Sequence, residues 1–352
     1  VTESGLTIKD LENSDLTYEK KHELNIGADL GFLDNRINLT VDWYKRDNFD
    51  LIGLVMTQGI GGQIQKYGNV ATMKSRGIEF SLSTKNIKTK DFSWTTDFIY
   101  SHMKNEVTKF NTSTRAFNLV SGIGFSREGY PVNSLFSYDF RGLNEDGVPT
   151  FINEAGVLTS TDINFQETER FDNLVYSGPS EPTDVGSFGN IFQYKGLRLN
   201  VFITYSFGNV VRLDPVFSSI YNDLDAMPRE FRNRWMTPGD ERYTDVPAIV
   251  SSRQVRNDSK LSYAYNAYNY STARIAKGDF IRMKEISLTY DFPKRWIKKL
   301  RMSNLALKIQ ATNLFLIYAD KKLNGQDPEF FNSGGVATPV PKQFTLTLKI
   351  GL

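Results

Sequence analysis

Strict alternation of apolar and polar side chains is the feature of this sequence that most constrains its fold. Ile286, Leu288, Tyr290 and Phe292 alternate with Glu285, Ser287, Thr289 and Asp291. A period of two places successive side chains on opposite faces of a β-strand. This segment is therefore predicted to be a strand with one apolar face and one polar face.

The same alternation recurs along the chain and predicts nine strands. They are expected near residues 23–32, 37–44, 78–83, 92–100, 188–194, 197–205, 285–292, 305–312 and 343–352. Short and long connections follow one another in turn, like the periplasmic turns and outer loops of outer-membrane barrels. We therefore predict an all-β fold, an antiparallel transmembrane β-barrel. Leu39 and Leu288 are expected to face lipid, and Thr40 and Ser287 the lumen.

The longer connections carry weaker patterns. A glycine-rich connection is expected to run from the second strand to about Ser75, and a short helix near Leu224 to Trp235. The segment from Phe136 to Ile152 alternates again, which fits either two more barrel strands or a hairpin within a loop. Both interpretations stay open at this point, so the chain holds nine to eleven barrel strands.

An odd number of strands bears on how the barrel closes. With nine or eleven antiparallel strands, the first and the last run in the same direction and cannot pair as antiparallel neighbours. An open sheet edge in hydrocarbon would leave a row of backbone donors and acceptors without partners. We therefore expect further strands upstream. The chain begins at Val1 without a signal peptide, and we interpret it as part of a longer protein.

Composition is compatible with a membrane barrel and excludes several other classes. The longest apolar run, Leu51 to Met56, is far shorter than a membrane helix, and there are 25 Phe and 17 Tyr to supply interfacial aromatic rings. The chain has no cysteine, which excludes disulfides and thiolate zinc sites. A formal net charge of +2 creates no general attraction for nucleic acid, and none is expected as a partner.

Several motifs in order resemble one known family. They are GDFIRMKEISLTYDFP from Gly278, ATNLF from Ala311 and DPEF from Asp327, preceded by segments such as DWYKRDNFDLI and YKGLRLNVFITYSFG. Together they resemble the closing part of the SusC-like (SusC/RagA) family of TonB-dependent outer-membrane transporters. The resemblance covers nearly the whole chain from about Asp15, although Leu352 stands where the family usually ends on an aromatic residue.

The resemblance implies a domain plan. Residues 1–352 would be the C-terminal part of one receptor barrel of about 22 strands. The plug, the TonB-contacting segment and the N-terminal strands would precede Val1, and none of them is in this chain.

The resemblance also implies a function. The whole protein would import a nutrient oligomer across the bacterial outer membrane, a glycan first and an oligopeptide second, with energy relayed through TonB. A SusD-like surface lipoprotein would sit on the long loops as a lid. The alternatives are a siderophore or vitamin receptor barrel without a lid partner, and a surface adhesin barrel that transports nothing.

No motif favours an enzyme. His22 and His102 stand apart, without a metalloprotease or nucleophile motif around them, so no catalytic residue, cofactor or metal is predicted.

The most notable polar and aromatic cluster lies in the long connection between residues 208 and 272. It comprises Tyr263, Tyr265, Asn266, Tyr268, Asn269 and Tyr270. Tyrosine offers a flat apolar face and a hydroxyl, so these residues are predicted to bind substrate; an interfacial aromatic girdle is the alternative.

Overall fold

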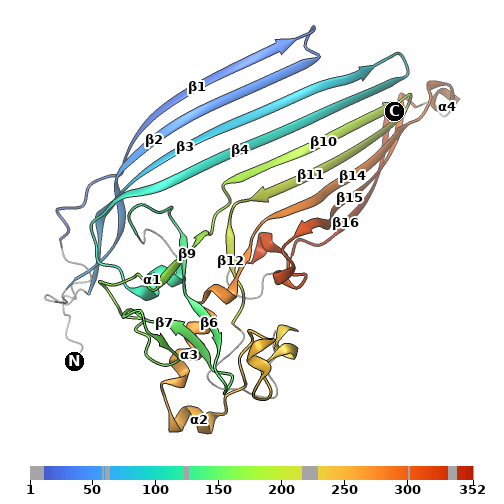
Figure 1. Cartoon of the computed structure of the whole chain (residues 1–352). Helices are drawn as coiled ribbons and strands as arrows, with labels where there is room; N and C mark the ends of the chain where they lie inside the picture. The colour runs from blue at the N-terminus through green and yellow to red at the C-terminus, as the bar shows by residue number, and fades with distance from the viewer. Residues whose placement is uncertain are drawn as a thin grey trace, which may run out of the picture.

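Nine long strands form the main sheet of the computed structural model. The structure describes residues 12–57, 59, 64–122, 127–215, 229–299, 302–331 and 339–351. The strands are β1 (Lys20–Phe32), β2 (Ile37–Met56), β3 (Gln65–Lys88), β4 (Phe92–Phe110), β10 (Asp184–Tyr194), β11 (Leu197–Phe207), β14 (Phe280–Asp291), β15 (Asn304–Ala319) and β16 (Gln343–Gly351). They are hydrogen-bonded in that order, and each pair is antiparallel (Figure 1). The nine predicted strands are confirmed.

The sheet is open within the described residues. β1 and β16 form its two edges and run in the same direction (Figure 1). The two edge strands therefore cannot close the sheet on each other as an antiparallel pair, as the sequence predicted.

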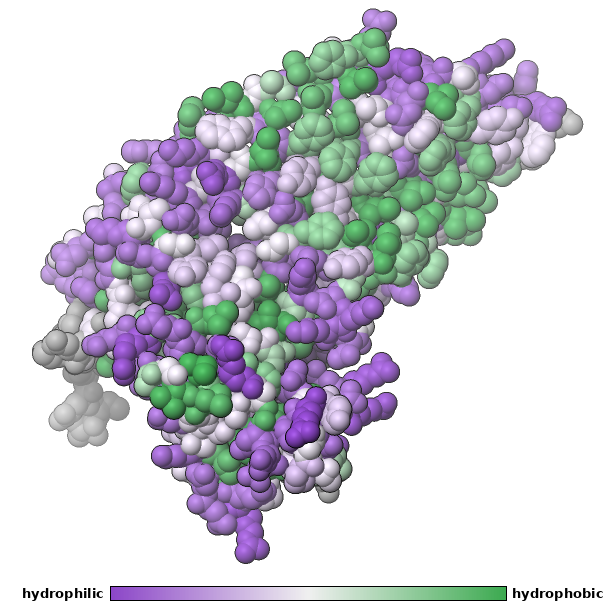
Figure 2. Space-filling model, in the orientation of Figure 1, coloured by the Kyte–Doolittle hydropathy of each residue, from purple (hydrophilic) through white to green (hydrophobic). Residues whose placement is uncertain are grey.

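The two faces of the sheet differ as the alternation predicted. One cross-strand row consists of Leu30, Leu39, Leu82, Phe98, Phe188 and Ile203. On the other face, the Thr40 hydroxyl donates a hydrogen bond of 2.6 Å to Asp29. Leu288 remains 40% exposed on the apolar face, whereas Ser287 is buried on the polar face. Figure 2 shows apolar residues gathered over the sheet and polar residues over the opposite end of the molecule. We call the side of the sheet that carries Leu39 and Leu288 the apolar face, and the side that carries Thr40 and Ser287 the inner face.

Tight turns join the strands at one end of the sheet, which we call the turn end. Residues 33–36 connect β1 to β2, residues 89–91 connect β3 to β4, and residues 195–196 connect β10 to β11. Leu33, Asp34 and Asn35 adopt positive φ angles of 52–58°, the left-handed conformation that a tight turn requires. The connection from β14 to β15 contains the short helix α4 (Lys294–Lys299).

One predicted loop is largely strand. β2 and β3 continue to Met56 and Gln65, so they are joined by residues 57–64 and not by a long connection reaching Ser75. The strands pair through a bulge near Asn48, where Asp50 takes a φ of 55°. Side-chain alternation weakens in this region although backbone pairing continues, because alternation reports which face is apolar and not which backbone groups are bonded.

The long connections fold into a second layer at the other end of the sheet, the loop end (Figure 1). Its strands are β5 (Ser134–Tyr138), β6 (Phe140–Leu143), β7 (Pro149–Ile152), β8 (Leu158–Thr159), β9 (Leu174–Pro179), β12 (Val210–Arg212) and β13 (Ile275–Lys277). Its helices are α1 (Ala116–Ser121), α2 (Ser252–Asn257) and α3 (Leu261–Asn269), with five 3-10 turns: η1 (Arg229–Asn233), η2 (Asp240–Arg242), η3 (Thr272–Arg274), η4 (Lys321–Leu323) and η5 (Pro328–Phe330). We call this layer the loop domain.

The loop domain settles the two open elements of the connections. Strands β6 and β7 pair with each other and lie outside the nine-stranded sheet, so the segment from Phe136 to Ile152 contains a loop hairpin and adds no barrel strand. The helix predicted near Leu224 to Trp235 appears in its described part as the 3-10 turn η1, and residues 224–228 lie outside the described residues.

The loop domain has an apolar core of its own. Leu119 of α1, Phe136 and Tyr138 of β5, Phe151 of β7 and Tyr268 of α3 are each at most 2% exposed and belong to one cluster. Their packing joins segments that are far apart in the sequence. Within the described residues, no helix is long and apolar enough to span a bilayer.

Candidate substrate pocket and the loop domain

The predicted tyrosine cluster lies on α3, which is a helix. Tyr270 is the C-cap residue of this helix. Tyr265 and Tyr268 are three residues apart, so they share one helix face, and they are 0% and 2% exposed. Tyr263 is 49% exposed and Asn266 is exposed, while Asn269 and Tyr270 are half-buried.

The two buried tyrosines have packing partners within the loop domain. The Tyr265 hydroxyl donates a hydrogen bond of 2.9 Å to the carbonyl oxygen of Ala248, and the Tyr268 ring meets Phe140 edge-on at 5.5 Å. Burial raises the pKa of Tyr268 to about 12 and raises that of Tyr265 as well. Both hydroxyls therefore stay protonated near neutral pH. The accessible members of the predicted site are Tyr263 and Asn266.

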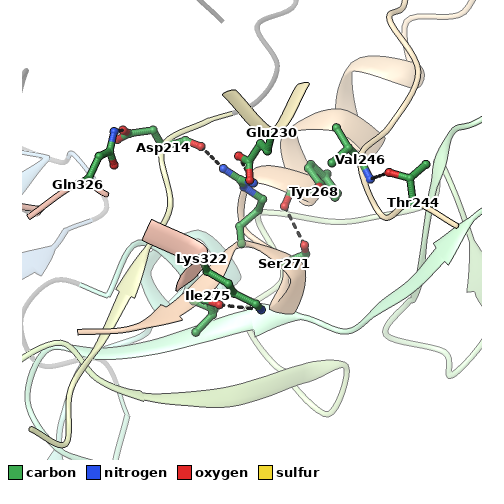
Figure 3. A network of polar contacts seen from close by, with 10 residues as sticks. Asp214, Glu230, Thr244, Val246, Tyr268, Ser271, Ile275, Lys322 and Gln326 are labelled. Carbon is green, nitrogen blue, oxygen red and sulfur yellow. Dashed lines mark hydrogen bonds and ion pairs between the residues drawn. The ribbon is translucent and has the colours of Figure 1, made fainter. Parts of the chain in front are cut away.

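Two arginines, the buried Arg274 and the half-buried Arg212, hold the loop domain together. Arg274 of η3 forms an ion pair of 2.5 Å with Glu230 of η1 and donates a hydrogen bond to the carbonyl oxygen of Asp214. Figure 3 shows this network between the ends of β12, η1 and η3. Because η1 and η3 are far apart in the sequence, this pair fixes the path of the long connection between β12 and β13.

Arg212 of β12 is held by neutral acceptors. Its guanidinium donates hydrogen bonds to the carbonyl oxygens of Phe136 and Val120 at 2.7 and 3.0 Å and lies over the ring of Tyr270. Burial lowers the pKa of Arg212 to about 10, yet the side chain remains charged at neutral pH. Arg212 thereby links β12 to α1 and β5.

The DPEF motif folds back against the inner face. Asp327 and Glu329 of this motif form ion pairs with Arg282 of β14, the Glu329 pair at 3.2 Å. Arg282 and Asp327 are both nearly buried, with side chains 6% and 9% exposed. The motifs GDFIR and DPEF, which carried much of the family resemblance, therefore contact each other in space.

A second contact fixes where β11 and β14 enter the loop domain. The amide of Gly208 donates to the carboxylate of Asp279 at 2.7 Å, and the amide of Gly278 donates to the carbonyl oxygen of Asn209 at 2.9 Å. A Cβ atom on Gly278 would lie 2.2 Å from the Asn209 side chain. A larger residue at this position would displace the Asn209 side chain, so glycine favours the close approach of the two segments.

These contacts border a pocket of about 610 Å³ at the loop end of the sheet. Part of its wall is the cross-strand row of Val185, Ser206 and Phe280 on the inner face. Thr204 and Lys284 add a hydroxyl and an ammonium group, and Pro328 and Glu329 of η5 lie on another side. The pocket thus offers an aromatic ring, hydroxyls and both signs of charge, which suits a polar ligand with some apolar surface.

Each of the two histidines contacts a neighbouring side chain. His22 packs edge-on against Phe49, and His102 lies 2.9 Å from Asp184, which also accepts a hydrogen bond from Tyr100. Within the described ranges, no group of three or more histidines and carboxylates has the arrangement of a metal site.

Comparison with known proteins gives the family. The model of the TonB dependent receptor-like β-barrel matches residues 4–314. The chain is 27% identical to the TonB-dependent receptor SusC of Bacteroides thetaiotaomicron, over 97% of this chain and 32% of that protein. It is 26% identical to the TonB-dependent receptor P3 of Formosa agariphila, over 93% of this chain and 32% of that protein. The chain therefore spans about a third of the length of these curated relatives.

The solved structures agree with this assignment. The structure of the RagAB peptide transporter matches with a TM-score of 0.76 and 25% identity, covering 99% of this chain and 37% of that chain. An open antiparallel sheet with an apolar face, short turns at one end and folded loops at the other is the wall of an outer-membrane β-barrel. The chain belongs to the family of TonB-dependent receptor β-barrels of the outer membrane.

Proposed function

We propose that this chain supplies the C-terminal wall and part of the outer loop domain of a TonB-dependent importer of nutrient oligomers. The observation that carries the proposal is the pocket between the inner face and η5. It lies at the loop end, which faces outward in barrels of this kind. A pocket there is well placed to hold a ligand before it passes through the barrel.

The chemistry of the pocket supports a polar oligomer as the substrate. Ser206 and Thr204 can exchange hydrogen bonds with sugar hydroxyls or with peptide groups, and Phe280 provides an apolar surface. Lys284 and Glu329 can bind opposite charges, as an oligopeptide carries at its ends and side chains. A glycan is proposed first and an oligopeptide second; the structurally similar RagAB is a peptide transporter, which supports the second.

The exposed part of the tyrosine cluster is proposed to extend this site. Tyr263 and Asn266 present a ring and an amide on the solvent side of α3. Such pairs stack on and hydrogen-bond to polar oligomers. The buried Tyr265 and Tyr268 would contribute by holding α3 in place, and the half-buried Asn269 and Tyr270 border the same face.

The proposal includes partners and a domain plan. A SusD-like surface lipoprotein would cover the loop domain as a lid, and TonB would act through a plug and a contacting segment upstream of Val1. Residues 1–352 would then be the C-terminal part of one barrel, and further strands would pair with the open edges β1 and β16.

Uptake by cells that carry the complete receptor and its lipoprotein tests the proposal. Fluorescent glycan and oligopeptide mixtures are supplied separately, with and without a protonophore. Energy-dependent uptake of one mixture is expected, and Lys284→Gln should reduce uptake of an acidic oligopeptide more than that of a neutral glycan. Lys308→Gln is the control, because Lys308 lies on β15 and does not line the pocket. Uptake that persists unchanged with the protonophore would contradict an importer.

A further inference from the structure

Three basic side chains form a row across β2, β3 and β4. Lys45 lies directly opposite Arg76, and Arg76 lies directly opposite Lys104. All three are exposed. They lie on the apolar face of the sheet. Two residues along each strand toward the turn end, the cross-strand row is Trp43, Ile78 and His102, and side chains two residues apart on a strand share a face.

None of these three cations has a protein partner. Within the described residues, no ion pair or hydrogen bond of their side chains is found. Side chains directly opposite each other in antiparallel strands lie about 5 Å apart at Cβ, and like charges at that spacing repel. The next row toward the loop end is Asp47, Lys74 and Glu106, in which the acidic groups flank Lys74. The first row therefore carries positive charge that no ion pair of the described residues neutralises.

The row lies at the edge of the membrane. On β2 the apolar face runs from Ile37 through Leu39 and Val41 to Trp43, and Lys45 is the first charged residue after them. Eight residues from Ile37 to Lys45 span about 27 Å along a strand, which after the usual tilt approaches the roughly 25 Å height of a barrel's apolar band. Trp43, 40% exposed, sits where interfacial tryptophans gather.

A depression accompanies the row. It has a volume of about 410 Å³, and its lining includes Trp43, Lys45, Arg76 and Lys104 together with Lys74 and Glu106. An aromatic ring together with ammonium and guanidinium groups suits a ligand with an apolar part and clustered negative charge. Arginine forks and lysine point charges both bind phosphate well.

We propose that Lys45, Arg76 and Lys104 bind the phosphorylated headgroup of an outer-leaflet lipid, with its acyl chains lying along the apolar face below Trp43. The loop end of the strands faces outward, so the row meets the outer leaflet at headgroup height. Phosphate supplies the negative charge that the row lacks. The site would fix the height and tilt of this part of the wall in the membrane.

The experiment uses the complete receptor in neutral detergent and bisphosphorylated lipid A as the probe, with retained lipid measured by native mass spectrometry. Each charge near a membrane surface contributes about fivefold to binding. The triple variant Lys45→Gln, Arg76→Gln, Lys104→Gln is therefore expected to weaken binding on the order of a hundredfold. The control Arg198→Gln, Lys308→Gln, Lys349→Gln removes the same charge from the inner face and should bind as the unaltered receptor does.

Two further measurements separate a lipid site from a simple anion site. Dephosphorylated lipid A should bind the unaltered receptor much more weakly, and inorganic phosphate should compete only at far higher concentration than lipid A. Equal binding by the triple variant or by the dephosphorylated lipid overturns the proposal, and so does inorganic phosphate competing at the same concentration. If the triple variant does not assemble, Lys104→Gln alone should weaken binding about fivefold, while Lys104→Arg should preserve it; equal binding by both contradicts the proposal.

Discussion

At the scale of single residues, Tyr268 is expected to serve packing of the loop domain and Tyr263 to serve substrate recognition. Both lie on α3, but Tyr268 is 2% exposed and Tyr263 is 49% exposed. Tyr268→Ala should destabilise the loop domain by about 3–5 kcal/mol, because it leaves a cavity in the aromatic core. Faster hydrogen exchange across α3 and β5 would report it. Exchange as slow as in the unaltered receptor would mean that Tyr268 is not part of a cooperative core.

The opposite result is expected for Tyr263. Tyr263→Ala should leave hydrogen exchange unchanged and weaken oligomer binding by roughly 1–3 kcal/mol, taking ring stacking on bases as an analogue. The binding isotherm of the complete receptor measures this, and Tyr263→Phe, which keeps the ring, is the matched control. If Tyr263→Ala binds the oligomer as tightly as the control, α3 holds the loop domain without touching substrate.

The ion pair between Arg282 and Asp327 allows a test of how much a nearly buried charge contributes to stability. Arg282→Met would leave the nearly buried carboxylate of Asp327 without its partner, which typically costs about 3–5 kcal/mol. Protease cleavage between residues 320 and 331 should therefore become much faster. Arg141→Gln is the control, because the Arg141 side chain is 56% exposed and its pair with Asp139 should contribute only about 0–1 kcal/mol. Equal cleavage in both variants would show that η5 is held by other contacts.

At the scale of elements, the sequence predicted strands well where one face meets lipid. Leu39 and Thr40 show the reason. A position that faces lipid must be apolar, whereas the next position faces the lumen and can be polar, so the alternation has a clear period of two. Beyond Lys45 charged and polar residues occupy both faces of β2 (RDNFD, residues 46–50) and the pattern fades, so the continuation to Met56 was not predicted. No helix was predicted at α3, although the buried Tyr265 and Tyr268 lie at helical spacing.

The assignment of faces can be tested on one strand. Leu39→Arg places a charge on the apolar face near mid-membrane and should cost about 2–4 kcal/mol in assembly of the complete barrel. Thr40→Arg places the same charge on the inner face and should be tolerated much better. Folded fractions are read from heat-modifiable migration after refolding across a urea series. Similar losses for both variants would show that the two faces are assigned the wrong way round or are not distinct.

At the scale of the whole molecule, the contacts that build the pocket were beyond reach of sequence patterns. Arg282 and Glu329 lie in two motifs that the sequence made conspicuous, but nothing in either motif says that they pair across 47 residues. Arg212 has no carboxylate partner among the residues that the structure describes, so no charge pattern points to it. Strand pairing follows from local alternation and short turns, whereas the loop domain depends on long-range packing that only the folded chain reveals.

The open sheet leads to a prediction for the chain as a whole. β1 and β16 each leave one side without a neighbouring strand in the described structure, and lipid cannot satisfy those backbone groups. Residues 1–352 refolded alone in detergent should therefore not migrate as a heat-modifiable, protease-resistant barrel, whereas the complete receptor treated in parallel should. Under the proposed domain plan, refolding the chain together with a separately expressed upstream part should restore both properties, because further strands would then pair with the two edges. A stable, protease-resistant barrel from residues 1–352 alone, at a mass that excludes dimers, would show that the edges close in a way that this open sheet does not predict.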